Sequence, residues 1–283
     1  MKKCISVLLV FFSLAAFVNA QDLVSKKGIP ILPEQGEWAI GADAFPFFYY
    51  LGNFFNDNYG NGAPEFNFTD NYPMTLYAKY MVDPKTAFRV KLQLTYNSSV
   101  DKEYVIKDAL VIDLDDQIED KAKRSYMDIV IGAGLEKRRG KGRLQGIYGA
   151  EALVMFGSEK SVFEYGNNWN PDIQHHVADF GDNINYEEYG IVNERKSGMS
   201  LGFQVRGFVG VEYFFAPKMS IGGEFGWGLG LAKQGEGELS YEYLDYVNEE
   251  TIITSETEKT AGGSSFGVST DNLSGAINLL FYF

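Results

Sequence analysis

The chain has 283 residues with 25 basic and 38 acidic side chains, so its formal net charge is −13. A chain this acidic is a poor candidate for nucleic-acid binding, because phosphates call for a basic surface. Apolar residues make up 45% of the sequence, which excludes a disordered protein. The 31 Gly, 22 Phe and 18 Tyr residues, against only 8 Pro, favour β-structure.

Residues 1–20 have the pattern of a secretory signal peptide, which is removed on export. The pattern has a positive start, an apolar stretch and a compact cleavage site (Lys2 and Lys3; Ile5–Val18; Val18-Asn19-Ala20). The apolar stretch is shorter than the ~20 residues that a membrane-spanning helix needs. We expect cleavage before Gln21, a periplasmic segment over 21–36, and no disulfide in the mature chain, since Cys4 is the only cysteine.

After the leader, apolar and polar residues alternate with a period of two along eight segments. In one of them, Phe88, Val90 and Leu92 alternate with Arg89 and Lys91. Successive side chains of a strand point to opposite faces, so each segment predicts a strand with one apolar and one polar face. The eight segments are 38–44, 74–82, 88–96, 127–135, 144–156, 201–213, 219–231 and 273–283.

The connectors between these segments alternate in length. Three are short (83–86, 137–143 and 216–218) and four are long (53–71, 98–123, 158–197 and 233–264). A transmembrane β-barrel has this arrangement, whereas a soluble β-sandwich rarely has its long loops at one end only. The apolar face also carries no charge, and a closed barrel pairs every backbone group of a strand in lipid.

We therefore predict an all-β fold: an antiparallel transmembrane β-barrel over 37–283, with eight strands, short periplasmic turns and long external loops. Ten strands would result if Leu239–Ile253 formed a further membrane hairpin, although its acidic residues suit water better than lipid.

In these features the chain resembles the small, eight-stranded outer-membrane β-barrel proteins of Gram-negative bacteria. Its last residues, with Phe281 and the terminal Phe283, resemble the signal that the barrel-assembly machinery reads in that family. The resemblance implies a place in the cell outer membrane, with the lipid bilayer and lipopolysaccharide as surroundings. The family contains adhesive proteins, enzymes and subunits of larger assemblies, so the resemblance does not decide function.

The polar face carries charges of both signs. The bases are Lys79, Arg89, Lys91 and Arg206, and the acids are Asp43, Asp128, Glu151, Glu212 and Glu224. In a barrel of about eight strands the interior is filled by side chains, and near-balance of charge suits a sealed interior better than an ion path. Counting from the turns, we expect Arg206 to meet Glu151 and to reach Glu224 in a salt network.

No catalytic motif stands out, so we expect a protein without enzymatic activity, cofactor or metal. The two histidines, His175 and His176, fall in the third long connector, and neighbours on an extended chain point apart. The acidic run 113–116 lacks the glycine and the late glutamate of an EF-hand calcium loop. Two alternatives stay open: an enzyme acting on lipid or peptide at the barrel rim through either histidine, and a narrow porin.

Acidic residues gather in the long connectors. The connectors 98–123, 158–197 and 233–264 hold eight acidic residues each, against nine basic ones together, while 137–143 carries five bases and should face the periplasm. Within 233–264, the stretches 238–246 and 249–257 alternate weakly, which predicts a hairpin that projects into solvent. The sequence therefore favours a barrel that displays acidic loops for surface interaction or as a subunit of an envelope complex. Its partner would be cationic or bridged by Ca²⁺ or Mg²⁺.

Overall fold

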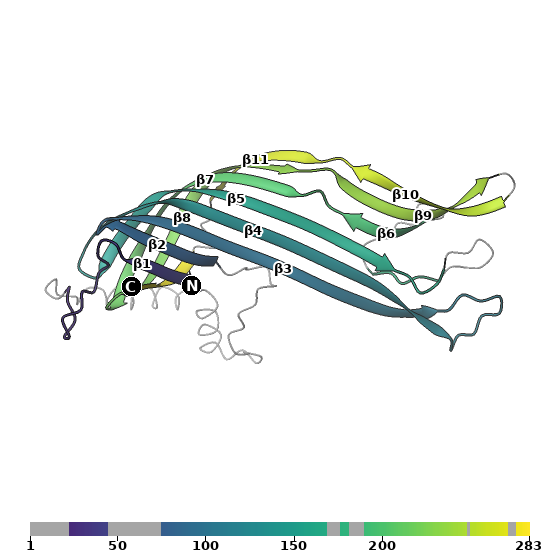
Figure 1. Cartoon of the computed structure of the whole chain (residues 1–283), viewed down its shortest axis with the longest axis horizontal. Coiled ribbons are helices and arrows are strands. Elements are labelled where there is room, and N and C mark those ends of the chain that lie inside the picture. Colours follow the sequence, from purple (N-terminus) through teal and green to yellow (C-terminus); the bar gives the residue numbers. More distant parts are fainter. Residues whose placement is uncertain (1–22, 45–74, 169–175, 181–189, 248–249, 271–275) are drawn as a thin grey trace, which may run out of the picture.

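The computed structural model describes residues 23–44, 75–168, 176–180, 190–247, 250–270 and 276–283, which form an antiparallel sheet without helices (Figure 1). The all-β antiparallel prediction is confirmed. The twelve strands are β1 (Trp38–Asp43), β2 (Thr75–Asp83), β3 (Thr86–Ile106), β4 (Gln117–Lys141), β5 (Leu144–Glu164), β6 (Gly190–Lys196), β7 (Ser200–Ala216), β8 (Met219–Gln234), β9 (Gly237–Val247), β10 (Glu250–Thr260), β11 (Gly263–Thr270) and β12 (Ala276–Tyr282). In the described part of the chain, no helix is long and apolar enough to cross a membrane.

Eight of the strands close into a ring. Each pairs with the next in the order β1-β2-β3-β4-β5-β7-β8-β12, and β12 pairs back to β1. These strands lie on the eight segments whose alternation predicted them. The alternative of ten ring strands is wrong for the described residues, because β9 and β10 form a hairpin that pairs with β6 outside the ring.

A second part of the sheet, here called the extension, continues beyond the ring. Strands β3, β4 and β5 have 21, 25 and 21 residues, and their distal halves join β6, β9 and β10 into six adjacent strands (Figure 1). The connectors predicted over 98–123 and 233–264 are therefore largely strand, and the connector over 158–197 contributes the end of β5 and all of β6. Their alternation is weaker because polar side chains occupy both faces, but β-branched and aromatic residues such as Val100 and Tyr104 still favour pairing.

The connection after β4 is also shorter than predicted. Pairing with β5 continues to Lys141, so only Gly142 and Arg143 lie between the two strands, and Gly142 has a φ of 71°. Glycine adopts this left-handed conformation without a Cβ clash, so it fixes the turn here rather than earlier. The expected turn over 137–143 is therefore wrong, and most of its bases lie on a strand.

The apolar core of the ring lies at the end that carries these short turns. Its members come from five strands and from the segment before β1: Ile31, Ala39, Tyr77, Met81, Ala87, Phe214, Leu280 and Tyr282, with Leu32 packed against them. Ile31 is fully buried, so the part of the predicted periplasmic segment that is described, from Leu23 on, folds against the ring.

Candidate functional site

The polar interior of the ring brings together the three residues of the predicted salt network. Arg206 and Glu151 are direct neighbours on β7 and β5, and Arg206 Nη1 lies 2.7 Å from Glu151 Oε1. The same guanidinium nitrogen lies 3.1 Å from Glu224 Oε1, which β8 carries. All three side chains are nearly excluded from solvent because inward-facing positions of neighbouring strands converge inside a narrow ring.

Two residues of β3 complete this upper cluster. Arg89 donates through both terminal nitrogens to Glu224, at 2.8 and 2.9 Å, and the Lys91 ammonium lies 2.8 Å from Glu151 and 2.9 Å from Glu224. Glu224 therefore accepts from three cations at once. The guanidinium carbon of Arg89 also lies 4.0 Å from the ring centroid of Phe208, a cation–π contact.

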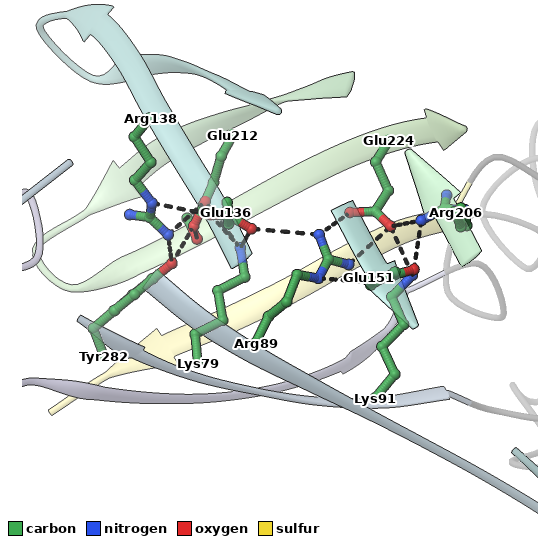
Figure 2. A network of polar contacts seen from close by, with 11 residues as sticks. Lys79, Arg89, Lys91, Glu136, Arg138, Glu151, Arg206, Glu212, Glu224 and Tyr282 are labelled. Carbon is green, nitrogen blue, oxygen red and sulfur yellow. Dashed lines mark hydrogen bonds and ion pairs between the residues drawn. The ribbon is translucent and has the colours of Figure 1, made fainter. Parts of the chain in front are cut away.

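A lower cluster continues the network toward the core, as Figure 2 shows. The Lys79 ammonium lies 2.8 Å from Glu136, and Arg138 lies 3.0 Å from both Glu136 and Glu212. The Tyr282 hydroxyl donates to Glu212 at 2.7 Å. Arg89 joins the two clusters, since its Nη1 lies 3.4 Å from Glu136.

Glu136 and Arg138 are the interior residues that the sequence prediction missed. The predicted strand ended at Leu135 and the predicted turn began at Lys137, so Glu136 fell between the two and Arg138 fell within the turn. The sequence did contain a signal for them. Glu136 and Arg138 continue the alternation of β4 beyond Leu135 on its inward-facing side, and both are buried in the structure. Conversely, the predicted interior acids Asp43 and Asp128 lie at or near the upper end of this interior and are only partly buried.

The interior charges of the two clusters almost balance. Five cations face four carboxylates: Lys79, Arg89, Lys91, Arg138 and Arg206 against Glu136, Glu151, Glu212 and Glu224. Buried charges are tolerated only when they are paired and hydrogen-bonded, so this network holds its side chains in fixed positions across the ring. These nine side chains fill the part of the interior that they occupy.

The segment before β1 closes the ring at its lower end. Ile31 inserts into the core, and its carbonyl oxygen accepts from the backbone N–H of Lys218 at 3.1 Å. The Lys218 ammonium donates to the Leu32 carbonyl at 3.0 Å and to Glu37 at 2.6 Å. Lys218 has a φ of 61°, and these contacts fix the β7–β8 turn in that conformation.

The outer face of the ring is apolar and exposed. Along β3, the side chains from Phe88 to Tyr96 that point outward are 40–59% exposed, while Arg89 and Lys91 between them are buried. The same alternation runs along β7 and β8, where Val205 and Trp227 are 49% and 48% exposed. The C-terminal Phe281 and Phe283 belong to this outer face, and Phe283 exchanges two backbone hydrogen bonds of 2.9 Å with Trp38.

The extension has its own buried anchor at Asp120 of β4. One carboxylate oxygen accepts from the backbone N–H of Gly166 at 2.7 Å and the other from that of Ala178 at 2.9 Å. Phe180 packs beside Phe163 of β5, and its carbonyl oxygen accepts from Arg124 at 2.7 Å. The described part of the third connector thus lies on one face of the extension.

Carboxylates of the extension pair with tyrosines as well as lysines. In the β9–β10 hairpin, the Tyr241 hydroxyl donates to Glu258 at 2.9 Å and to Glu256 at 3.2 Å, and the Glu258 hydrogen bond raises the pKa of Tyr241 above its ordinary value. On β4, hydrogen bonds from Lys102 lower the pKa of Glu119. The predicted hairpin in the fourth connector is present, although its strands run over 237–247 and 250–260.

The two histidines are separated in what the structure describes. His175 lies outside the described residues, together with the neighbouring Asp172. His176 Nδ1 lies 2.7 Å from Asp108 Oδ1, at the distal end of the extension, and its backbone N–H donates to the same oxygen. Asn167 donates to the carbonyl oxygens of Ile106 and His176, both at 2.9 Å, and accepts from the backbone N–H of Asp108. These contacts form a polar clasp, defined here as Asp108, Asn167 and His176.

The acidic run 113–116 forms a turn of its own. The Asp113 carboxylate accepts from the backbone N–H of Asp115 at 3.0 Å, and its carbonyl oxygen accepts from Asp116. Across the described residues, no group of three or more His, Cys, Asp or Glu side chains is arranged to hold a metal ion. No protein-family model matches the chain, and no curated protein is significantly similar to it, so the argument for function rests on the geometry above.

Proposed function

We propose that this chain is an exported, non-enzymatic protein that spans the outer membrane as an eight-stranded β-barrel and presents its extension to a partner at the cell surface. The observation that carries the proposal is the contrast between the two faces of the ring. Aliphatic and aromatic side chains are exposed outward, while ionised side chains are buried inward. A soluble domain has the opposite arrangement.

The energetics of each face support this proposal. An exposed apolar surface that encircles a ring is far larger than the patches that monomeric proteins leave in water, and it is stable against lipid tails. Strand length fits as well: the outward apolar run of β3 covers nine residues from Phe88 to Tyr96, close to the 9–11 that a tilted membrane strand needs. In the described residues each ring strand pairs with a neighbour on both sides, as the backbone of a strand in lipid requires.

The orientation follows from the connections. The three short turns after β2, β4 and β7 lie at one end, and the extension lies at the other (Figure 1). Outer-membrane barrels place short turns in the periplasm and long connections outside. A signal peptide over residues 1–20 agrees with this route. The extension would then stand on the cell surface, above the lipopolysaccharide.

The charge of the extension indicates the class of partner. The three long connectors hold 24 of the 38 acidic residues of the chain. Anionic lipopolysaccharide would repel such a surface unless divalent cations bridged the two. We therefore propose a cationic partner, or one held through Ca²⁺ or Mg²⁺, whose capture weakens in high salt or with a chelator.

The test is behaviour in a membrane mimic and on cells. The purified protein should refold into detergent with a β-type circular dichroism spectrum and should migrate differently on gels before and after boiling. Protease added to intact cells should cut the extension and spare the ring. A helical or disordered spectrum in detergent, or a chain that stays wholly soluble after export, would overturn the proposal.

Two other functions make different predictions. A narrow porin would conduct ions in planar bilayers, whereas the paired charges inside the ring favour a sealed barrel with no conductance. An enzyme acting through a histidine has one observation in its favour, the contact between His176 and Asp108, although this contact lies at the distal end of the extension and not at the rim of the ring. Loss of a hydrolytic activity on lipids or peptides in His176→Ala, with the barrel intact, would support the enzyme and refute the proposal.

A further inference from the structure

The connection between β3 and β4 carries an unusual apolar surface. Leu110 is 89% exposed, Val111 84%, Leu114 69% and Ile112 47%. These side chains lie within residues 109–114, here called the apolar tip, at the end of the extension farthest from the ring (Figure 1). Four aliphatic side chains held together in water are typical of a surface that another molecule covers.

The apolar tip does not belong to the outer face of the ring. The continuous apolar run of that face on β3 ends at Tyr96, and the strand continues for ten residues to Ile106, with Val100 and Tyr104 as its only exposed apolar or aromatic side chains on the same side. At about 3.3 Å per residue, this places the base of the tip roughly 33 Å beyond Tyr96. The residues between them are mainly polar and exposed, so the same bilayer cannot cover both surfaces.

The structure holds the tip in place from its base. The backbone N–H of Lys107 donates to the Asp116 carbonyl at 2.9 Å, which closes the connection. The clasp then ties Asp108 to Asn167 and His176, on the chain that follows β5. The aliphatic side chains are therefore presented on an anchored support.

The charges around the tip select the occupant. Asp113, Asp115 and Asp116 are exposed beside the aliphatic side chains, and Lys107 is the only base in the connection, 3.4 Å from Asp116. Anionic headgroups would be repelled by this frame, as would a second copy of this acidic chain. A protein surface whose apolar groove is bordered by lysine or arginine matches both the apolar side chains of the tip and the negative charges around them.

We propose that the apolar tip is a docking element that inserts Leu110 and Val111 into an apolar, base-rimmed groove of a partner protein. The inference rests on the proposed function, because it takes the extension to stand clear of the membrane, and it adds to that function the chemistry of the contact. Leu110 and Val111 supply the apolar contact, and the three aspartates supply charge complementarity.

The experiment uses the full mature chain in nanodiscs of zwitterionic lipid, with empty nanodiscs as the blank. Two labelled 14-residue peptides serve as probes: an amphipathic helix of Leu and Lys, and a Ser/Lys peptide of equal charge. The test variant is Leu110→Ser/Val111→Ser. The matched control is Ile252→Ser/Ile253→Ser, which removes two exposed aliphatic side chains from β10 of the same extension.

We expect the Leu/Lys peptide to bind the unaltered protein above the blank, and the test variant about a hundredfold more weakly, since two buried aliphatic side chains are lost. The control variant should bind the Leu/Lys peptide as tightly as the unaltered protein does. The Ser/Lys peptide should bind the test variant and the unaltered protein equally. Asp113→Asn/Asp115→Asn/Asp116→Asn should weaken binding and reduce its salt dependence. Equal binding of the Leu/Lys peptide by test variant and unaltered protein overturns the inference.

Two further outcomes would show that something other than a partner protein covers the apolar tip, and either one would refute the inference. Tip-dependent attachment to phosphatidylglycerol vesicles in preference to the peptide would identify a bilayer. Concentration-dependent dimers that Leu110→Ser/Val111→Ser abolishes would identify a second copy. A chain that does not insert into nanodiscs refutes the proposed membrane function alone, and peptide binding measured on that soluble chain still decides the role of the tip.

Discussion

Replacing Glu224 by Gln should destabilise the ring strongly, because this carboxylate is the point where three buried cations meet. Its oxygens lie 2.8–3.1 Å from nitrogens of Arg89, Lys91 and Arg206. Gln keeps the shape of the side chain and removes the charge. Five buried cations would then face three carboxylates, and the amide group would turn a donor toward one of the cations.

The size of the effect follows from burial. Glu224 is 4% exposed and Arg89 is 2% exposed, so water cannot replace the lost charge. Removing one partner of a buried ion pair typically costs about 3–5 kcal/mol, which corresponds to a decrease of roughly 10²–10⁴ in the folding equilibrium constant. In the double variant Arg206→Gln/Glu224→Gln one charge of each sign is removed, so its loss should be smaller than the sum of the two single losses.

The assay is urea unfolding of the protein refolded in lipid vesicles. Trp38 and Trp227 lie on the outer face, so their fluorescence reports on insertion, and the boiled and unboiled gel bands report on folding. The matched control is Glu119→Gln in the extension, a carboxylate within 3.4 Å of two lysines but at the surface, where we expect no measurable change. If Glu224→Gln were as stable as this control, the ring interior would be hydrated and the argument for a sealed network would fail.

Three further predictions concern other parts of the chain. Deleting Phe283 should impair assembly and leave export intact, while Phe283→Ala, which keeps the backbone pairing to Trp38, should assemble better than the deletion; equal assembly of the deletion and the unaltered chain on heat-modifiability gels would show that the terminal residue is not part of the assembly signal. Tyr241 should remain protonated above pH 10.0, because its hydrogen bond to Glu258 raises its pKa, so the stabilisation that this bond gives to the hairpin persists below that value and is lost only as the pH rises through the raised pKa. The absorbance difference between the unaltered protein and Tyr241→Phe measures this ionisation, and a midpoint at or below 10.0 contradicts it. His176→Ala should increase proteolysis near the distal end of the extension without changing the urea midpoint of the ring, since the contacts of the clasp among the described residues lie in the extension; unchanged proteolysis would mean that the clasp does not anchor it.

The sequence alone determined the eight strands of the ring, because one apolar face and one polar face impose a period of two that no other regular structure shares. It also predicted the contact between Arg206 and Glu151. Their strands are consecutive members of the ring, and counting from two turns fixes the register to within a residue or two. Parity assigned Arg89 and Lys91 to the interior for the same reason. These are local rules, and each can be read along a single strand.

Tertiary structure decided what lies beyond those local rules. The end of β4 depended on pairing with β5, which runs through Arg138 to Lys141, so Arg138 of the lower cluster was hidden within a predicted turn and Glu136 lay beyond the predicted strand. The extension depended on the pairing of β6 with β5 and with the β9–β10 hairpin, which lies about 40 residues further along the chain. The apolar tip appears as an exposed surface only once the β3–β4 connection is placed at the far end of that sheet. The weak alternation of the fourth connector predicted its hairpin, but it could not specify the pairing of that hairpin with β6, because pairing between strands far apart in the sequence is a non-local interaction.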